Sequence, residues 1–241
     1  MAASSAIVPP NPPAPDTKFD RRLAEILDFA TQVFADKGYE GASIRDLSRL
    51  SGISLAGLYY YFDSKEKLLY YIQKHTFTTI LDRLRERLAH ETDPEQRLRV
   101  FIHNHVQYAL EHDKAMKVLS HEDDVLRNGY RTELSGIKRE YYQICFALVQ
   151  DVLRASRTSG ASRASHIRTA VMSLFGAINW LYTWHNRKSD LGANELARQI
   201  SDIFVQGIHG AEAEADDPRG NRSLRSKSAR GVRSSVRRSR E

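Results

Sequence analysis

The sequence predicts an all-α protein in which three N-terminal helices precede a bundle of six more. Apolar residues recur at i, i+3, i+4 and i+7 along most of the chain, which is the spacing of an amphipathic helix. No segment shows the strict alternation of apolar and polar residues that indicates a β-strand. Two short helical patterns also meet at Gly52, which is typical of helices joined by a tight turn. These three observations define the expected fold class.

The composition is that of a globular chain without covalent cross-links. The sequence has 241 residues, of which 41% are hydrophobic, enough for one large or two small domains with a sizeable core. Its single cysteine, Cys145, excludes a disulfide framework and a zinc site built from cysteines. The chain has no run of eighteen apolar residues and no signal-peptide pattern at its start. We therefore expect a cytoplasmic protein without a membrane partner.

The net charge of +6 is concentrated in one segment. Residues 218–241 hold nine lysines and arginines against one acid, a net charge of +8, which leaves −2 for the preceding 217 residues. Residues 18–67 contain eight cations and eight anions. Any binding of nucleic acid by the N-terminal region must therefore depend on where its cations face, because bulk attraction is absent there.

The first predicted domain covers residues 19–63 and follows a disordered arm, residues 1–18, that is rich in Ala, Ser and Pro. Its first helix starts at Phe19 and ends where Lys37 and Gly38 supply a cationic last turn and a C-cap. Its inner face carries apolar residues at helical spacing: Leu23, Ile26, Leu27, Ala30, Val33 and Phe34. We expect this helix to brace the two short helices that follow.

The two short helices lie within residues 42–69. Ser43 is a suitable N-cap for the first, and Gly52 can adopt the left-handed conformation that ends it, so that the chain restarts at Ser54. The buried face of the first helix is expected at Ile44, Leu47 and Leu50. Two helices around a tight turn form the helix-turn-helix arrangement, whose second helix fits the major groove of DNA.

Several side chains of this unit are suited to contact DNA. Tyr59 and Tyr60 carry hydroxyls that can donate to phosphate oxygens, and the helix N-termini at Ser43 and Ser54 favour anions. Gly57 allows the backbone to come close to a groove. The candidate cations are Arg45, Arg49 and Lys65. Simpler interpretations remain open, since Tyr61 and Phe62 could be core residues and the arginines a solvated helix face.

The second predicted domain covers residues 64–210 and contains six helices. Asp63 and Glu66 give the first of them a start that resembles a capping box, and Pro94 takes the first helical position of the second. The six are expected to begin near residues 64, 94, 113, 130, 165 and 193. The composition changes after residue 210, and residues 211–241 are expected to be a disordered basic tail. The tail could wrap on DNA phosphates or have no function.

The run S-I-R-D-L-(x4)-G-I-S-x-x-x-L-Y-Y-Y-F-x-S-K-E-x-L-L resembles the N-terminal domain of TetR-type transcriptional regulators. The resemblance covers about residues 21–69, while family members share only helical character beyond it. It implies phosphate contacts by Ser43, Tyr60 and Lys65. It also implies base or groove contacts by Arg45, Ser54, Leu55, Gly57 and Tyr59. Many members have Lys-Gly-Thr where this chain has Leu55-Ala56-Gly57, so direct base contacts would fall on fewer residues.

Catalytic and metal-binding chemistry find little support in the sequence. It has no Gly-x-Ser-x-Gly elbow, no P-loop and no dinucleotide fingerprint, so we do not expect an enzyme. His103, His105, His121 and Glu122 come nearest to a metal cluster, but His-x-His alternation on a helix points the two rings in different directions. We therefore expect no metal and no cofactor.

The central helices combine aromatic residues with a few polar ones, the usual make-up of a small-molecule pocket. Each residue could equally be an ordinary core residue, but together they suggest a cavity. The candidate pocket residues are Phe101, His105, Tyr108, Tyr141 and Trp184.

Two function classes follow from these features. The first is a ligand-responsive repressor that releases a palindromic operator in double-stranded DNA when a small molecule binds. Within the family, the pair Trp180-x3-Trp184 resembles regulators that sense acyl-CoA thioesters or other lipid-derived effectors. The second is an architectural DNA-binding protein that senses no ligand.

Assembly as a homodimer is expected in either case, because helix-turn-helix proteins usually read palindromic sites as two-fold dimers. The last two helices offer apolar stripes with small residues that allow close packing. The candidate interface residues are Phe175, Gly176, Asn179, Ile200, Ile203 and Phe204.

Overall fold

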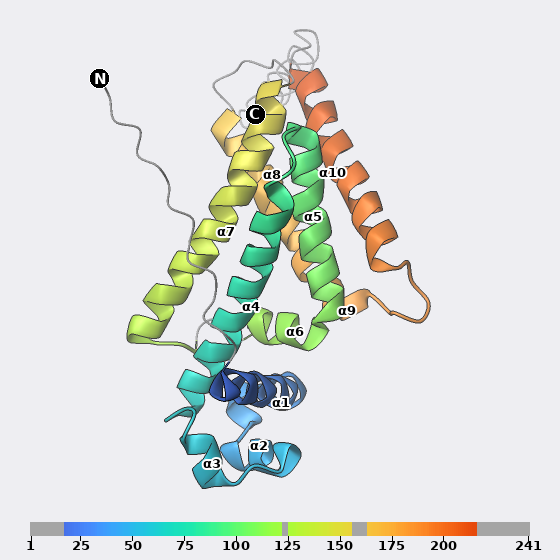
Figure 1. Cartoon of the computed structure of the whole chain (residues 1–241). Coiled ribbons are helices and arrows are strands. Elements are labelled where there is room, and N and C mark those ends of the chain that lie inside the picture. Colours follow the sequence, from blue (N-terminus) through green and yellow to red (C-terminus); the bar gives the residue numbers. More distant parts are fainter. Residues whose placement is uncertain (1–16, 122–124, 156–162, 216–241) are drawn as a thin grey trace, which may run out of the picture.

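The computed structural model describes residues 17–121, 125–155 and 163–215 (Figure 1). These ranges contain ten α-helices and no β-strand, which confirms the all-α fold class. The expected N-terminal arm lies outside the described residues up to residue 16, and the expected tail lies outside them from residue 216. Two of the expected boundaries are wrong, because Lys18 already belongs to the first helix and the last helix extends to Ala215.

The helix-turn-helix unit forms one end of the molecule (Figure 1) and consists of α1 (Lys18–Gly41), α2 (Ile44–Ser51) and α3 (Leu55–Tyr59). The helical path of α1 breaks at Gly38, whose φ of 70° lies in the left-handed region. Gly52 has the same φ of 70° and caps α2. Both glycines stand where the sequence predicts a helix end, since a residue with a side chain is strained in this conformation.

Local hydrogen bonds explain why α2 and α3 start where they do. The Ser43 hydroxyl accepts from the Asp46 amide at 3.1 Å, and the Asp46 carboxylate accepts from the Ser43 amide at 3.0 Å, which completes a capping box. Ser54 caps α3 by accepting from the Gly57 amide at 3.1 Å. The predicted N-caps of both helices are confirmed.

The remaining helices form the bundle that stands above this unit (Figure 1). They are α4 (Lys65–Leu88), α5 (Pro94–Glu111), α6 (Asp113–His121), α7 (Asn128–Ala155), α8 (Arg163–Asn179), α9 (Leu181–Trp184) and α10 (Ala193–Ala215). The long α4 runs from the helix-turn-helix unit into the bundle, and α10 lies along the outside of the bundle (Figure 1).

Two details of the bundle differ from the sequence prediction. Ser64, not Asp63, caps α4, because its hydroxyl accepts from the Lys67 amide at 3.1 Å while the Asp63 carboxylate pairs with the Lys67 ammonium. The helix expected to begin near residue 165 is divided into α8 and α9 at Trp180, which leaves the helical conformation at ψ 8°. No glycine or proline marks that break in the sequence.

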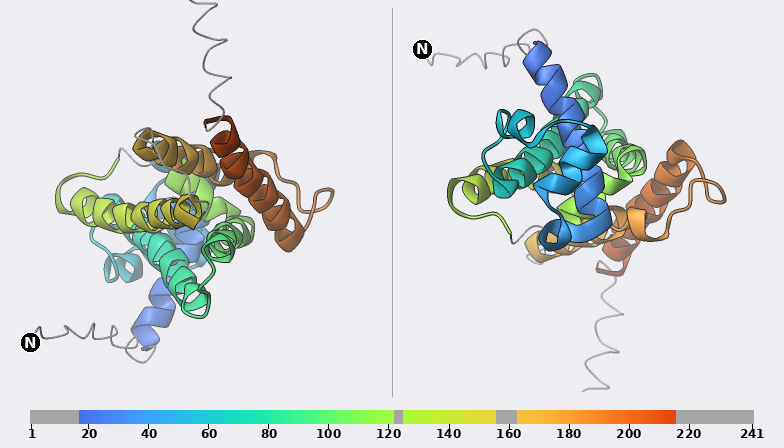
Figure 2. Two further views of the ribbon diagram at one scale, coloured as in Figure 1. Left: turned by 90° about the horizontal axis from the view of Figure 1, so that it is seen from above. Right: turned by 90° about the horizontal axis from the view of Figure 1, so that it is seen from below.

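The buried residues form two clusters. The larger lies among α4, α5, α7, α8 and α10, and the smaller lies in the helix-turn-helix unit and the first turns of α4. The smaller cluster also contains Val118 of α6, Leu134 of α7 and Leu126 just before α7, each at most 2% exposed. Figure 2 shows α1 crossing the end of the bundle beneath these elements. The helix-turn-helix unit therefore shares its core with the bundle.

Within the described residues, no helix is both long enough and apolar enough to span a lipid bilayer.

Candidate nucleic-acid interface and effector site

The outer surface of α2 and α3 presents most of the residues predicted to contact DNA. Ser43, Arg45 and Ser54 are exposed. The three large side chains of the second helix and its end are also exposed, with exposed fractions of 38% for Leu55, 53% for Tyr59 and 74% for Tyr60. Exposed apolar and phenolic groups on one short helix are suited to contacts with base edges and phosphates.

The two aromatic residues that follow turn inward. Phe62 is 1% exposed and Tyr61 is half-buried, so the core interpretation is right for Phe62. The ring of Tyr61 stacks on Phe19, with centroids 4.8 Å apart, and Tyr60 meets the edge of the same Phe19 ring at 6.0 Å. Phe19 thus joins the start of α1 to the end of α3. Sequence reasoning missed this contact, because the two segments are separated by forty residues.

Asp46 holds α2 against α1. Its carboxylate accepts from the Lys37 ammonium at 2.8 Å and also pairs with the Arg49 guanidinium. Hydrogen bonds from Lys37 and then from Ser43 hold the pKa of Asp46 well below its usual range. Arg49 is therefore partly neutralised by its own helix, which leaves Arg45 as the better candidate for a DNA contact.

Gly57 is explained by packing within the turn. A Cβ atom at this position would lie 3.0 Å from the Ile53 methyl carbon Cγ2 and 3.2 Å from the Ser54 hydroxyl. A side chain would thus push α3 away from the turn that precedes it. This packing is a reason for the glycine within the protein itself. The predicted close approach of its backbone to DNA stays a prediction.

Lys65 has a role inside the protein that the sequence did not predict. Its ammonium donates to the carbonyl of Tyr39 at 2.8 Å and to the carbonyl of Ala42 at 3.1 Å. It also lies 4.2 Å from the centroid of the Tyr39 ring. The side chain therefore ties the start of α4 to the end of α1. An ammonium has three protons, so a phosphate contact by Lys65 stays a prediction.

Polar contacts also join α4 to α7 beside the reading unit. The Tyr70 hydroxyl donates to Glu133 at 2.5 Å, and the Lys74 ammonium pairs with the same carboxylate at 2.7 Å. The Tyr70 ring stacks on Tyr130 with centroids 4.5 Å apart. One turn earlier, Glu66 accepts from the backbone amide of Arg127 at 2.8 Å. These contacts connect the N-terminal part of α4 to α7 and to the residue just before it.

Three of the predicted pocket residues meet in the core of the bundle. Phe101, His105 and Tyr141 are at most 4% exposed. The rings of Phe101 and Tyr141 lie 4.9 Å apart, and Phe175 closes the group at 6.0 Å from both. His105 Nδ1 shares a hydrogen bond of 3.1 Å with the Tyr141 hydroxyl. We call these four residues and Asn104 the buried polar cluster.

Two atoms of the buried polar cluster lack a partner in the described part of the chain. Asn104 donates to the Ile80 carbonyl at 3.0 Å, but its Oδ1 atom accepts no hydrogen bond. His105 Nε2 is also unsatisfied, although the Asn179 side chain lies close by. Burial lowers the pKa of His105 to about 4, so its ring is neutral at neutral pH. Buried polar atoms usually find a hydrogen-bond partner in the protein or in water.

The other two predicted pocket residues lie elsewhere. Tyr108 is buried, but its ring pairs with His112 at 4.4 Å and with the Arg83 guanidinium at 5.5 Å, so it faces α4. Trp184 is 55% exposed. The break at Trp180 places it on the short helix α9, so a pocket contact by Trp184 stays a prediction.

The predicted dimer interface is partly exposed. Ile203 of α10 is 73% exposed and Gly176 of α8 is exposed, and Met172 on the same helix is 53% exposed. The remaining candidates are half-buried: Phe175, Asn179, Ile200 and Phe204. Phe175, Ile200 and Phe204 pack on the larger core. The freely exposed part of the expected interface is therefore carried by Met172, Gly176 and Ile203.

Comparison with known proteins supports the same division of the chain. Residues 26–72 match the sequence profile described as "Bacterial regulatory proteins, tetR family", and residues 91–208 match the profile "Tetracyclin repressor-like, C-terminal domain". The HTH-type transcriptional repressor KstR2 of Rhodococcus jostii is 25% identical over 201 residues, which cover 82% of this chain and 96% of that protein.

Two further similarities agree with this match. The fatty acid metabolism regulator protein of Bacillus subtilis is 24% identical over 192 residues, 78% of this chain and 96% of that protein. The solved structure of AibR in complex with isovaleryl coenzyme A and operator DNA superposes with a TM-score of 0.67 at 21% identity, covering 76% of this chain and 97% of AibR. Together with the two profiles and the exposed helix-turn-helix unit, they lead to one conclusion: the chain belongs to the TetR family and is a DNA-binding transcriptional regulator.

Proposed function

We propose that the protein is a ligand-responsive repressor that binds a palindromic operator as a homodimer and releases it when a small molecule enters the bundle. The observation that carries this proposal is the shared core. Val118, Leu126 and Leu134 belong to the bundle by sequence but are buried in the helix-turn-helix unit. A rearrangement of α6 or α7 must therefore change the packing beneath α1, because cores tolerate little volume change. Since operators lie on the chromosome, we expect the protein to act in the cytoplasm.

The DNA contacts would come from two exposed groups of residues. Leu55 and Tyr59 are exposed on α3 and would reach base edges, and the exposed Tyr60 and the N-terminus of α2 at Ser43 would contact phosphates. Arg45, which is also exposed, would add a cation. Because residues 18–67 carry no net charge, specificity would rest on these few contacts.

The proposed effector is an acyl-CoA thioester or a related lipid-derived molecule. This class is supported by the names of the relatives, a fatty acid metabolism regulator among them, and by the isovaleryl coenzyme A in the AibR complex. The buried polar cluster provides a place where the acyl group could end. His105 Nε2 and Asn104 Oδ1 would supply one donor and one acceptor to a polar group on that chain.

The alternative function, an architectural DNA-binding protein without an effector, also has an observation in its favour. The rings of Phe101, Tyr141 and Phe175 fill the space between α5, α7 and α8, so a ligand would have to displace one of them. We favour the repressor, because the relatives include the repressor KstR2 and the AibR structure holds isovaleryl coenzyme A together with operator DNA.

The DNA-binding half of the proposal is tested by gel-shift titration of an operator selected from random duplexes. Tyr59→Ala and Tyr60→Ala should each lower operator affinity without changing the melting temperature, because both side chains are exposed. Leu191→Ala is the matched control, since Leu191 is 42% exposed but lies in the loop before α10. Equal affinity of the two tyrosine variants and the wild type would place the DNA-binding surface elsewhere.

The effector half is tested by a thermal-shift screen of acyl-CoA thioesters of different chain lengths, followed by DNA release. A coupling of about 1 to 3 kcal/mol, typical between linked sites, would lower operator affinity about 5- to 150-fold. By reciprocity, the operator would weaken effector binding by the same factor. If no thioester stabilises the protein, or if the stabilising compound leaves DNA binding unchanged, the alternative function is favoured.

A further inference from the structure

A groove lies on the outside of the bundle where the end of α4 meets α5 and the start of α10. Its volume is about 590 Å³, within the usual range for small-molecule sites. Its polar lining consists of Arg87, Arg99, His103, Asn194, Arg198 and Ser201, and Val100 and Ala197 supply apolar surface. Three of these residues are arginines and none is a carboxylate. The groove therefore combines guanidinium groups with a small apolar surface.

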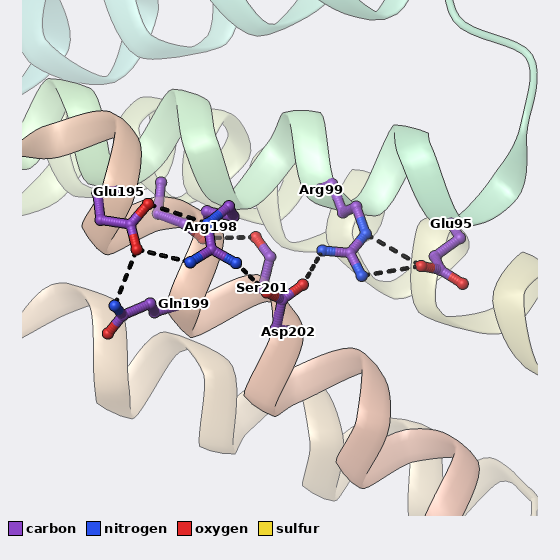
Figure 3. A network of polar contacts seen from close by, with 8 residues as sticks. Glu95, Arg99, Glu195, Arg198, Gln199, Ser201 and Asp202 are labelled. Carbon is purple, nitrogen blue, oxygen red and sulfur yellow. Dashed lines mark hydrogen bonds and ion pairs between the residues drawn. The ribbon is translucent and has the colours of Figure 1, made fainter.

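The carboxylates that neutralise two of the arginines are not part of the lining. Figure 3 shows their ion pairs with Arg99 and Arg198. Arg99 donates to Asp202 at 2.6 Å and to Glu95 at 3.0 Å. Arg198 donates to the other oxygen of Asp202 at 2.9 Å and to Glu195 at 2.6 Å. These contacts fix the two guanidinium groups in place, so that little side-chain entropy remains to be lost when a ligand binds.

The third arginine has an unused donor. Arg87, in the last turn of α4, donates through Nη2 to the Gln107 amide oxygen at 2.7 Å. Its Nη1 atom is buried and has no hydrogen-bond partner within the described ranges. A buried cationic donor is costly to leave unpaired, and an anion in the groove would satisfy it.

The groove is separate from both surfaces already described. Ile203 follows Ser201 by two residues and therefore points to the opposite side of α10, so the proposed dimer would leave the groove open. On α5, His103 faces the groove and bonds to Asn194 at 2.9 Å, while His105 points into the buried polar cluster. The expectation that the two rings diverge is confirmed.

We propose that this groove binds a nucleotide-type ligand, with a phosphate group on Arg87, Arg99 and Arg198 and the base against Val100 and Ala197. The planar guanidinium group matches the oxygens of a phosphate and can bind two of them at once. An apolar surface beside fixed cations suits a purine ring that carries phosphates. No residue of the groove is needed for contact with DNA.

Two sources of this chemistry are possible. The first is the nucleotide end of a coenzyme A thioester, and this source rests on the proposed function. The second is a free nucleotide that binds independently of the effector. Adenosine 3′,5′-bisphosphate is a suitable probe for both, because it is the phosphorylated end of coenzyme A and is itself a free nucleotide.

The test is isothermal titration calorimetry of the full-length protein with adenosine 3′,5′-bisphosphate, coenzyme A and an acyl-CoA thioester. The variants are Arg198→Ala, whose side chain is 59% exposed, and Arg87→Leu. Each should lower affinity about tenfold or more, the effect of losing a charge-assisted hydrogen bond. Arg85→Ala is the matched control, since Arg85 is also ion-paired, with Asp82 and Glu140, but lies outside the groove. Circular dichroism checks that each variant is folded.

The outcomes separate the two sources. Binding of the bisphosphate alone that both groove variants weaken supports an independent nucleotide site. Binding of the thioester alone that both variants weaken supports the nucleotide end of the effector. The proposal is overturned if no probe binds, or if Arg198→Ala and the control bind every probe as the wild type does. A thioester that releases DNA equally from wild type and groove variants would exclude the nucleotide end of the effector as the ligand of the groove and would leave the proposed function intact.

Discussion

The side chain of Lys65 connects parts of the chain that no local pattern could have joined. The sequence marks the residue as a cation near the reading unit, and the resemblance implies a phosphate contact. In the structure its ammonium caps the carbonyls of Tyr39 and Ala42, more than twenty residues earlier. N-caps such as Ser43 were predictable because their partners lie three residues away. The partners of Lys65 and Phe19 depend on the tertiary fold and were not.

Removal of the Lys65 ammonium should destabilise the protein as well as weaken DNA binding. In Lys65→Met, two hydrogen bonds to carbonyls and the contact with the Tyr39 ring are lost. We expect the free energy of unfolding to fall by about 1 to 3 kcal/mol, measured by urea denaturation. Lys67→Met is the control, since its exposed ion pair with Asp63 should matter little. Equal stability of the two variants would contradict the capping role.

Acid should destabilise the protein through His105. Because burial lowers the pKa of His105 to about 4 from an ordinary value of 6.5, the unfolded state binds more protons between these two pH values. Stability should therefore fall as the pH is lowered from 6.5 towards 4, by about 3 kcal/mol for this residue. His112, whose pKa burial also lowers, contributes in the same direction.

The contribution of His105 is isolated by its substitution. His105→Gln should flatten the dependence of the melting temperature on pH between 7 and 5, whereas His103→Gln, on the other side of α5, should leave it as in the wild type. The same slope in all three proteins would show that the buried imidazole is not responsible.

Helix boundaries were predictable where a glycine, a proline or a capping residue marks them. Gly38, Gly52 and Pro94 each stand at the expected place. The break between α8 and α9 has no such mark, and α9 is too short to show a periodicity. The prediction from the sequence therefore continued one helix through Trp180 and placed Trp184 in the interior of the bundle. Because this single break was missed, Trp184 was expected to be buried, whereas it is 55% exposed.

Two glycines of different conformation should respond oppositely to substitution by alanine. Gly52→Ala should lower the free energy of unfolding by about 1 to 2 kcal/mol, because φ is +70° there. Gly136→Ala, within α7, should raise it by about 0.5 to 1 kcal/mol, since a Cβ would have no neighbour within 4 Å. Urea denaturation measures both. A stabilised Gly52→Ala variant would mean that the turn between α2 and α3 relaxes without strain.

For the whole molecule, the sequence predicted two helical domains, but the structure places α6 and the start of α7 on the core of the first. Periodicity identifies which residues of a helix are buried and gives no information about which other helix buries them. The predicted DNA-contact residues are adjacent in sequence, and most lie on one exposed surface. The predicted pocket residues come from three helices, α5, α7 and α9, and only three of the five meet.

The dimer interface is the remaining prediction at this scale. Phe175 packs on the core, so a charge there would unfold the protein, whereas Ile203 and Met172 are largely exposed on α10 and α8. Large exposed apolar side chains on neighbouring helices mark an interaction surface. Ile203→Glu and Met172→Glu should each shift the protein to monomers in sedimentation-velocity experiments, because a two-fold interface repeats each new charge in both subunits.

Operator binding should fall together with dimerisation, because a monomer presents one reading unit to a site of two half-sites. Leu191→Glu is the control, since Leu191 is 42% exposed on the loop before α10 and should leave the dimer intact. Circular dichroism must show that the α8 and α10 variants keep their helical content, so that loss of binding reflects separation and not unfolding. If dimers survive both charged substitutions, the interface lies away from α8 and α10, and the exposed Ile203 requires another partner.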